Sequence, residues 1–144
     1  LALVNPPLRT QSDHDAVIAA LRDATIDTIS TDHAPHTADD KAAGAPGFTG
    51  SETAFAVCNT VLVKQEGFSL NRLSELMSAN TAEILGLKKG LLQPEYDADF
   101  VLVDPDENWI VNAKNFASKG KASPFEGKSL TGRVKKLFVA GREI

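Results

Sequence analysis

The first part of the chain is predicted to run strand, helix, strand, and this order constrains the fold more than any other feature. Residues 1–4 form an apolar run that favours a strand, which also leads us to expect that the sequence begins inside an element. Apolar residues at helical spacing predict a helix over residues 13–23, with Ser12 or Asp13 as its cap. Residues 25–31 are rich in Ile and Thr and predict a second strand. This half therefore reads as α/β.

The rest of the chain changes from helical to β patterns. Apolar residues support helices over 52–65 and 69–85, the second interrupted near Asn80 and Thr81 and closed by Gly86 and Gly90. After residue 93, Pro, Asp and Gly separate short apolar runs. The tail is therefore predicted to be mostly β, with strands over 100–103, 109–111 and 134–139 and a long irregular loop over 116–132.

Composition bounds the class of protein. A chain of 144 residues, 42% of them hydrophobic, can form one domain or part of a larger one. The net charge is −4 and the basic residues are scattered, so nucleic acid is not expected as a partner. The single cysteine, Cys58, can form neither an internal disulfide nor a multi-cysteine metal site. No apolar stretch approaches the roughly 20 residues that span a bilayer, and we expect no membrane contact and a cytoplasmic location.

The residues with most chemical potential follow the second predicted strand. Asp32, His33 and His36 lie within five residues, between that strand and a Gly-rich loop. Parallel α/β barrels place catalytic groups at such strand ends, where Asp can bind zinc or act as a base and His can bind metal or substrate. The same residues could instead cap a turn and line the surface. Spacing alone leaves both interpretations open.

Four segments, in order, resemble the motifs of one enzyme family. Thr-Asp-His-Ala-Pro-His at 31–36 resembles the strand-eight motif of dihydroorotases, zinc enzymes of the amidohydrolase superfamily. Asn-Pro-Pro-Leu-Arg at 5–9 is similar to the segment that follows their strand seven. Gly-Ser-Glu-Thr-Ala-Phe at 50–55 and Ser-Lys-Gly-Lys-Ala-Ser-Pro-Phe at 118–125 resemble two further family motifs. The resemblance thus covers most of the chain.

The resemblance implies a fold and a domain division. Residues 1–92 would be the C-terminal part of a metal-dependent-hydrolase (β/α)8 barrel, and residues 93–144 part of a small C-terminal β domain. Two of eight strands cannot close a barrel, so strand edges and apolar helix faces would be exposed. We therefore expect a C-terminal fragment that forms a homo-oligomer or associates with a missing N-terminal part.

The resemblance also implies site residues. The family aspartate at the position of Asp32 binds zinc and shuttles a proton from the attacking hydroxide to the leaving amide nitrogen. Asn5 and His36 would hold the substrate, and Pro46 and Gly47 lie where the family's substrate loop contacts the pyrimidine ring, although that loop is shorter here. Asn5 is also a competent turn former, His36 could merely pack on the loop, and the Gly-rich segment could be an ordinary connection. His33 receives no catalytic role.

The resemblance further implies a binuclear zinc centre whose other ligands lie upstream in the family and are not found here. We therefore expect the isolated fragment neither to bind zinc tightly nor to turn over substrate. The expected activity of the whole protein is interconversion of N-carbamoyl-L-aspartate and dihydroorotate, with an aspartate transcarbamoylase as a candidate partner. Two alternatives stay open: a hydantoinase or allantoinase type of cyclic amidohydrolase, and a non-catalytic dihydroorotase-like scaffold subunit.

Overall fold

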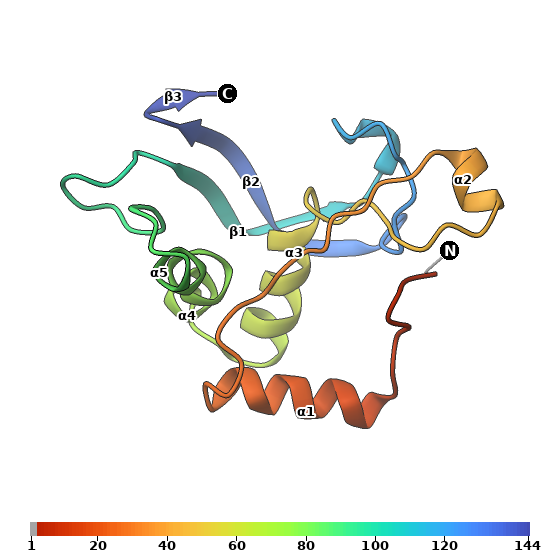
Figure 1. Ribbon diagram of the computed structural model, residues 1–144, viewed down its shortest axis with the longest axis horizontal. Coiled ribbons are helices and arrows are strands. Elements are labelled where there is room, and N and C mark those ends of the chain that lie inside the picture. Colours follow the sequence, from red (N-terminus) through yellow and green to blue (C-terminus); the bar gives the residue numbers. More distant parts are fainter. Residues whose placement is uncertain (1–2) are drawn as a thin grey trace.

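The computed structural model describes residues 3–144, which form a helical part followed by a small antiparallel sheet (Figure 1). The mixed helix and sheet composition predicted from the sequence is confirmed, and the sheet is not a closed barrel. The elements, in chain order, are α1 (Gln11–Arg22), α2 (Ala38–Ala42), α3 (Ala54–Cys58), the π-helical η1 (Asn59–Gln65), α4 (Leu70–Ser74), the π-helical η2 (Glu75–Ala79), α5 (Asn80–Ile84), β1 (Phe100–Ile110), the 3-10 helix η3 (Ala113–Asn115), β2 (Ser129–Val139) and β3 (Arg142–Glu143).

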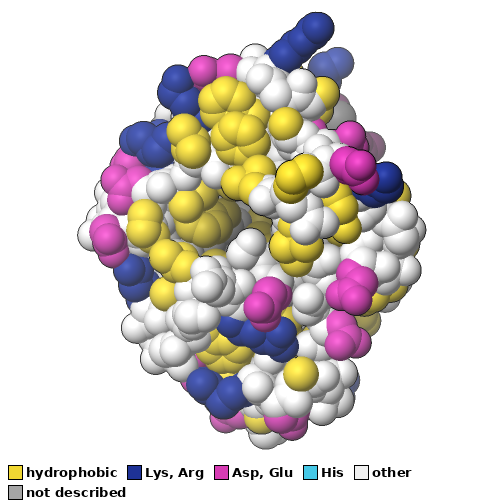
Figure 2. All heavy atoms as spheres, turned by 90° about the vertical axis from the view of Figure 1, so that its left-hand side faces the viewer, with side chains coloured by type: hydrophobic (Ala, Val, Ile, Leu, Met, Phe, Trp, Pro, Cys, Tyr) yellow, Lys and Arg dark blue, Asp and Glu magenta, His cyan; other side chains and the backbone are white. Residues whose placement is uncertain are grey.

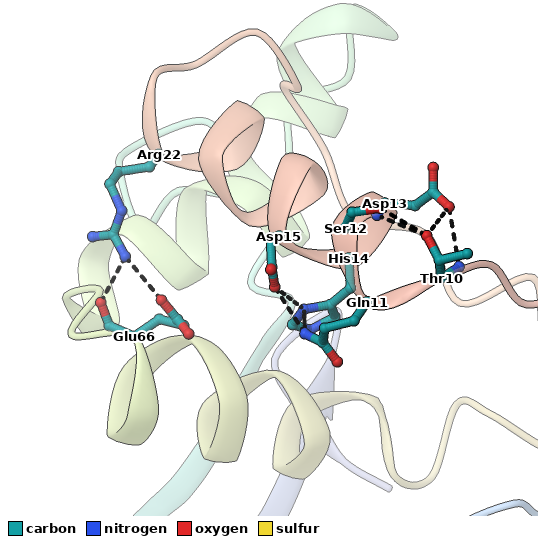
Figure 3. Close-up of polar contacts among 8 residues, drawn as sticks. All are labelled: Thr10, Gln11, Ser12, Asp13, His14, Asp15, Arg22 and Glu66. Atoms are coloured by element: carbon teal, nitrogen blue, oxygen red, sulfur yellow. Dashed lines mark hydrogen bonds and ion pairs between the residues drawn. The ribbon is translucent and has the colours of Figure 1, made fainter.

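Helix α1 confirms the first predicted helix and corrects its cap. The N-cap is Thr10, and Asp13 is the third helical residue of a capping box, so neither Ser12 nor Asp13 is the cap itself. Hydrogen bonds from the hydroxyl and N–H of Thr10 hold the pKa of Asp13 below its ordinary value (Figure 3). At the other end, Arg22 donates to the Glu66 carbonyl and carboxylate at 2.9 and 3.2 Å, which joins α1 to the end of η1.

The strand predicted over residues 25–31 is not formed. A strand needs a neighbouring strand to bond its peptide groups, and among the described residues this segment has none beside it. Instead, the Ile29 N–H donates to the Leu76 carbonyl at 2.8 Å. Ile26 and Ile29 still pack on the helical core, so the apolar residues of this segment face inward although the segment is not a strand. The strand predicted at residues 1–4 lies partly outside the described residues, and residues 3–4 are not in a strand.

The helices predicted over 52–65 and 69–85 are both present, as α3 with η1 and as α4, η2 and α5. The expected break near Asn80 is wrong, because that residue has helical angles (φ −62°, ψ −40°) and its side-chain amide donates to the Asp27 carbonyl. Gly86 follows the last helix with φ +65°, as predicted. The core between these helices and α1 contains Leu21, Leu62, Phe68, Leu73 and Leu76.

The sheet has the order β1-β2-β3 and is antiparallel throughout. The two strands predicted over 100–103 and 109–111 belong to one longer strand, β1, whose register shifts between Asp104 and Asn108. The loop predicted over 116–132 is shorter, because β2 already begins at Ser129. The strand predicted over 134–139 is confirmed as the second half of β2. A second core joins the sheet to α3 through Ala56, Val111, Ala113, Phe116 and Leu130.

Large hydrophobic side chains remain exposed in the described chain. Figure 2 shows hydrophobic groups gathered around a hollow on the side where the segment between α5 and β1 lies. The exposed residues of this segment and of the neighbouring helix and strands include Ile84, Leu85, Leu87, Leu91, Leu92, Val101, Leu137 and Val139. Apolar faces are thus uncovered, as the sequence led us to expect. No helix within residues 3–144 has the length and apolar character needed to cross a membrane.

Candidate functional site

A small concavity brings together four of the five predicted site residues. It measures about 220 Å³ and is lined by Val4, Asn5, Pro6, Thr31, Asp32, Ala34, Pro46, Gly47 and Phe48. Asn5, Asp32 and the Pro46–Gly47 pair come from three separate segments, and none of these segments is a helix or strand. The Gly47 N–H donates to the Leu3 carbonyl at 2.9 Å and thereby joins two of the segments. Asp32 and Asn5 are both exposed, so their side chains are accessible to a ligand.

The backbone at Asp32 is unusual. Its φ is +43°, in the left-handed region that non-glycine residues seldom adopt, although Asp and Asn tolerate it better than most. Such conformations persist only where the surrounding structure fixes them, and they occur often at functional sites. The carboxylate that the sequence marks as the reactive group therefore lies at a strained point of the chain.

His36 lies behind Gly47 and is not among the residues that line the concavity. A Cβ placed on Gly47 would be 3.3 Å from His36 Cδ2 and 2.8 Å from both the carbonyl oxygen and Cβ of Ala34. Gly47 has a φ of +118°, so both its conformation and its close neighbours require glycine. On its other side, the backbone of His36 packs against Gly120, whose Cβ would meet the His36 nitrogen and oxygen at 2.9 Å.

Lys41 supports the loop beside the concavity and was not predicted from the sequence. Its ammonium group donates to the carbonyls of Ala45 and Gly47 at 2.7 and 2.8 Å, and more weakly to Leu3 at 3.4 Å. These three hydrogen bonds hold the loop of residues 44–50 against the N-terminal segment. The helix that carries Lys41, α2, was also missed, although its capping box, formed by Thr37 and Asp40, is a recognisable pattern.

Three of the four motif segments, 31–36, 50–55 and 118–125, are joined by hydrogen bonds. The His33 ring accepts from the Gly50 and Ser51 N–H groups. Glu52 then accepts from the N–H groups of Ala117 and Ser118 at 2.8 and 3.0 Å. The buried Thr49 hydroxyl donates to the Gly120 carbonyl at 2.6 Å, and its N–H donates to Ala122. The motifs at 50–55 and 118–125 thus support the concavity, and only those at 5–9 and 31–36 reach its surface.

The possible metal donors in the described part of the chain are not gathered in one place. Among residues 3–144, the structure brings no three His, Cys, Asp or Glu side chains together as a metal site. Asp32 is a suitable oxygen donor for zinc, but a zinc centre needs about four donors. The described residues therefore do not form a metal centre by themselves.

The concavity is built from loops and carries one carboxylate at a strained backbone position, and enzyme sites are commonly built in this way. The chain belongs to the amidohydrolase family, whose model matches residues 3–144. It is 46% identical over 139 residues to a dihydroorotase of Clostridium botulinum (strain Eklund 17B / Type B), a match that covers 96% of this chain and 35% of that protein. Other relatives at 43 to 47% identity carry the same name.

Solved structures of related enzymes have the same fold over nearly the whole chain. The L-hydantoinase (dihydropyrimidinase) of Arthrobacter aurescens matches with a TM-score of 0.91 and 33% identity, covering 99% of this chain and 34% of its own. The dihydropyrimidinase of Brevibacillus agri NCHU1002 matches with a TM-score of 0.93 and 25% identity, over 99% and 33% of the two chains. The present chain thus spans about a third of the length of the proteins it matches.

Proposed function

We propose that this sequence is the C-terminal part of a dihydroorotase, which interconverts N-carbamoyl-L-aspartate and dihydroorotate. The observation that carries the proposal is the concavity in which Asn5, Asp32, Pro46 and Gly47 meet, at positions where the sequence resembles the family's substrate and proton-transfer residues. Relatives with that name at 43 to 47% identity support the choice of substrate.

In the complete protein, we propose that residues 1–92 complete a (β/α)8 barrel and that residues 93–144 join a small β domain. Residues 25–31 would then gain the neighbouring strand that they lack here, and their peptide groups would bond to it. Asp32 would follow directly at the strand end, where barrel enzymes carry their reacting groups.

The proposed chemistry centres on the Asp32 carboxylate. It accepts a proton from the attacking water and donates it to the amide nitrogen that leaves when the ring opens, and ring closure reverses both transfers. Asn5, Pro46 and Gly47 would orient the cyclic amide, Asn5 through its side-chain amide and the loop through its peptide groups. His36, which lies behind Gly47 in this structure, would hold the substrate in the complete protein. Zinc is the proposed cofactor of the complete protein, with Asp32 as one of its ligands.

The remaining proposals concern partners and location. We propose that the complete protein is cytoplasmic and homo-oligomeric, that it acts on a small-molecule substrate, and that an aspartate transcarbamoylase is a candidate partner. The uncovered apolar surface is consistent with further contacts.

A comparison of substrates tests the proposed function. The complete protein that carries this sequence, loaded with zinc, should hydrolyse dihydroorotate in preference to hydantoin and allantoin. Preference for hydantoin or allantoin would instead support the second candidate, which the 33% identical L-hydantoinase structure favours. No turnover of any of the three would favour a scaffold subunit.

The two glycines of the substrate loop allow a matched prediction. Replacing Gly47 by alanine should lower kcat/KM for dihydroorotate by about 10- to 100-fold, because the new Cβ would displace Ala34 and His36 and so distort the site. Gly44→Ala is the control, since Gly44 also has a positive φ (+89°) but has no atom within 4 Å of the added Cβ. Steady-state kinetics on both variants measure the difference, and equal losses would show that backbone strain alone is responsible.

A further inference from the structure

His33 stands beside the reactive carboxylate and has no role in the chemistry proposed above. Its Nδ1 atom accepts hydrogen bonds from the backbone N–H groups of Gly50 and Ser51, both at 3.1 Å. Both partners are donors, so Nδ1 must present its lone pair and the proton of the neutral ring lies on Nε2. The histidine therefore acts through one defined atom.

These bonds fix the backbone on one side of Asp32. The next residue, Ala34, donates its N–H to the Phe48 carbonyl at 3.1 Å, which continues the contact between the two segments. On the other side of Asp32, Gly50 packs against the Thr31 carbonyl oxygen, 3.4 Å from the position of an added Cβ. Residues 31–34 are thus held against residues 48–51 at both ends of the left-handed turn.

The segment that His33 bonds is itself anchored. Glu52 follows Ser51 and accepts from the Ala117 and Ser118 N–H groups. The buried Thr49 hydroxyl donates to the carbonyl of Gly120 in the same loop. His33 therefore connects the Asp32 turn to a fixed part of the structure and not to a free loop. Removing it would leave two N–H groups without this acceptor and the turn without one of its constraints.

We propose that His33 is a positioning residue, which holds the Asp32 carboxylate in its reactive orientation through Nδ1 and the Gly50 and Ser51 N–H groups. This inference rests on the proposed function, in which Asp32 transfers the proton. Residues that orient a reacting group from behind commonly contribute about 10- to 100-fold to activity.

Two amide substitutions test the two ring nitrogens of His33 separately. His33→Asn places an amide oxygen close to the position of Nδ1, whereas His33→Gln extends one carbon further, toward the position of Nε2. In the complete zinc-loaded protein, His33→Gln and His33→Ala should lower kcat about 10- to 100-fold with little change in KM, and His33→Asn should recover most of the loss. His14→Ala is the control, because the His14 side chain lies on α1, hydrogen-bonds to Gln11 and Asp15, and does not line the concavity.

Hydrogen exchange provides a second readout that does not depend on the substrate. Peptides covering residues 48–53 should exchange faster in His33→Gln and His33→Ala than in the wild type and in His33→Asn. Equal kcat losses in all three variants, or none in any, would overturn the proposal, as would unchanged exchange. If the wild type acts on a different cyclic amide, or on none, the proposed function fails while the exchange experiment still decides whether His33 holds this segment.

Discussion

Asp32→Asn should lower the turnover of dihydroorotate by the complete protein by about a thousandfold or more, since an amide can neither accept nor donate the transferred proton. Asparagine has nearly the same shape as aspartate and is among the residues that best tolerate a φ of +43°. The loss would therefore report on the carboxylate and not on a distorted turn. Turnover and bound zinc should be measured on the same samples.

Asp39→Asn is the matched control for that experiment. Asp39 is an exposed carboxylate in the first turn of α2, on the segment that follows the motif, and it does not line the concavity. Its removal should leave kcat within about twofold of the wild type, as is usual for a surface change. If Asp32→Asn kept more than a tenth of the wild-type turnover, Asp32 would not be the proton-transfer group.

Gly132→Ala should be strongly destabilising, by about 2–5 kcal/mol from backbone strain and overpacking together. Gly132 has a φ of +101°, and an added Cβ would lie 2.6 Å from Asn59 Nδ2. Asn59 is fully buried and donates to the carbonyls of Pro105 and Thr131 at 3.0 and 2.8 Å, so its displacement would also break the contact between η1 and the sheet.

Gly127→Ala isolates the backbone contribution. Gly127 has a comparable positive φ (+73°) but open space around the added atom, so only strain of about 1–2 kcal/mol is expected. Urea denaturation of the complete protein measures both variants. Equal shifts of the two midpoints would show that Asn59 moves aside without loss.

The longer helical runs were predictable from the sequence because their signals are local. Periodic apolar residues and a glycine after the last turn lie within one segment, and they gave α1 and the two later helical runs nearly to their ends. Strands depend on pairing with other segments, which the local sequence does not reveal. Residues 25–31 lack a partner and form no strand, whereas β1 continues through Asp104 to Asn108 because β2 pairs with both of its halves.

The concavity was predictable to the extent that it follows a motif. The resemblance singled out Asn5, Asp32 and the loop at Pro46 and Gly47, and the structure brings these residues together. The hydrogen bonds that support the concavity were not predictable, because Glu52 lies 65 residues from its partner Ala117 and nothing in the local sequence indicates the pair. Lys41 illustrates the same difficulty, since a lysine that bonds carbonyls of a folded loop looks like any surface lysine in the sequence.

The hydrogen bonds between the helical part and the tail also explain how the fold tolerates divergence. On the helical side these bonds are made by the side chains of Thr49, Glu52, Asn59 and Thr60. On the side of residues 117–131 they are made by peptide N–H and carbonyl groups, which do not depend on the side chain. Mutations in the tail can therefore accumulate without altering what those side chains recognise, provided that the backbone keeps its path. The dihydropyrimidinase of Brevibacillus agri illustrates this tolerance, because it keeps the fold of this chain with a TM-score of 0.93 at only 25% sequence identity.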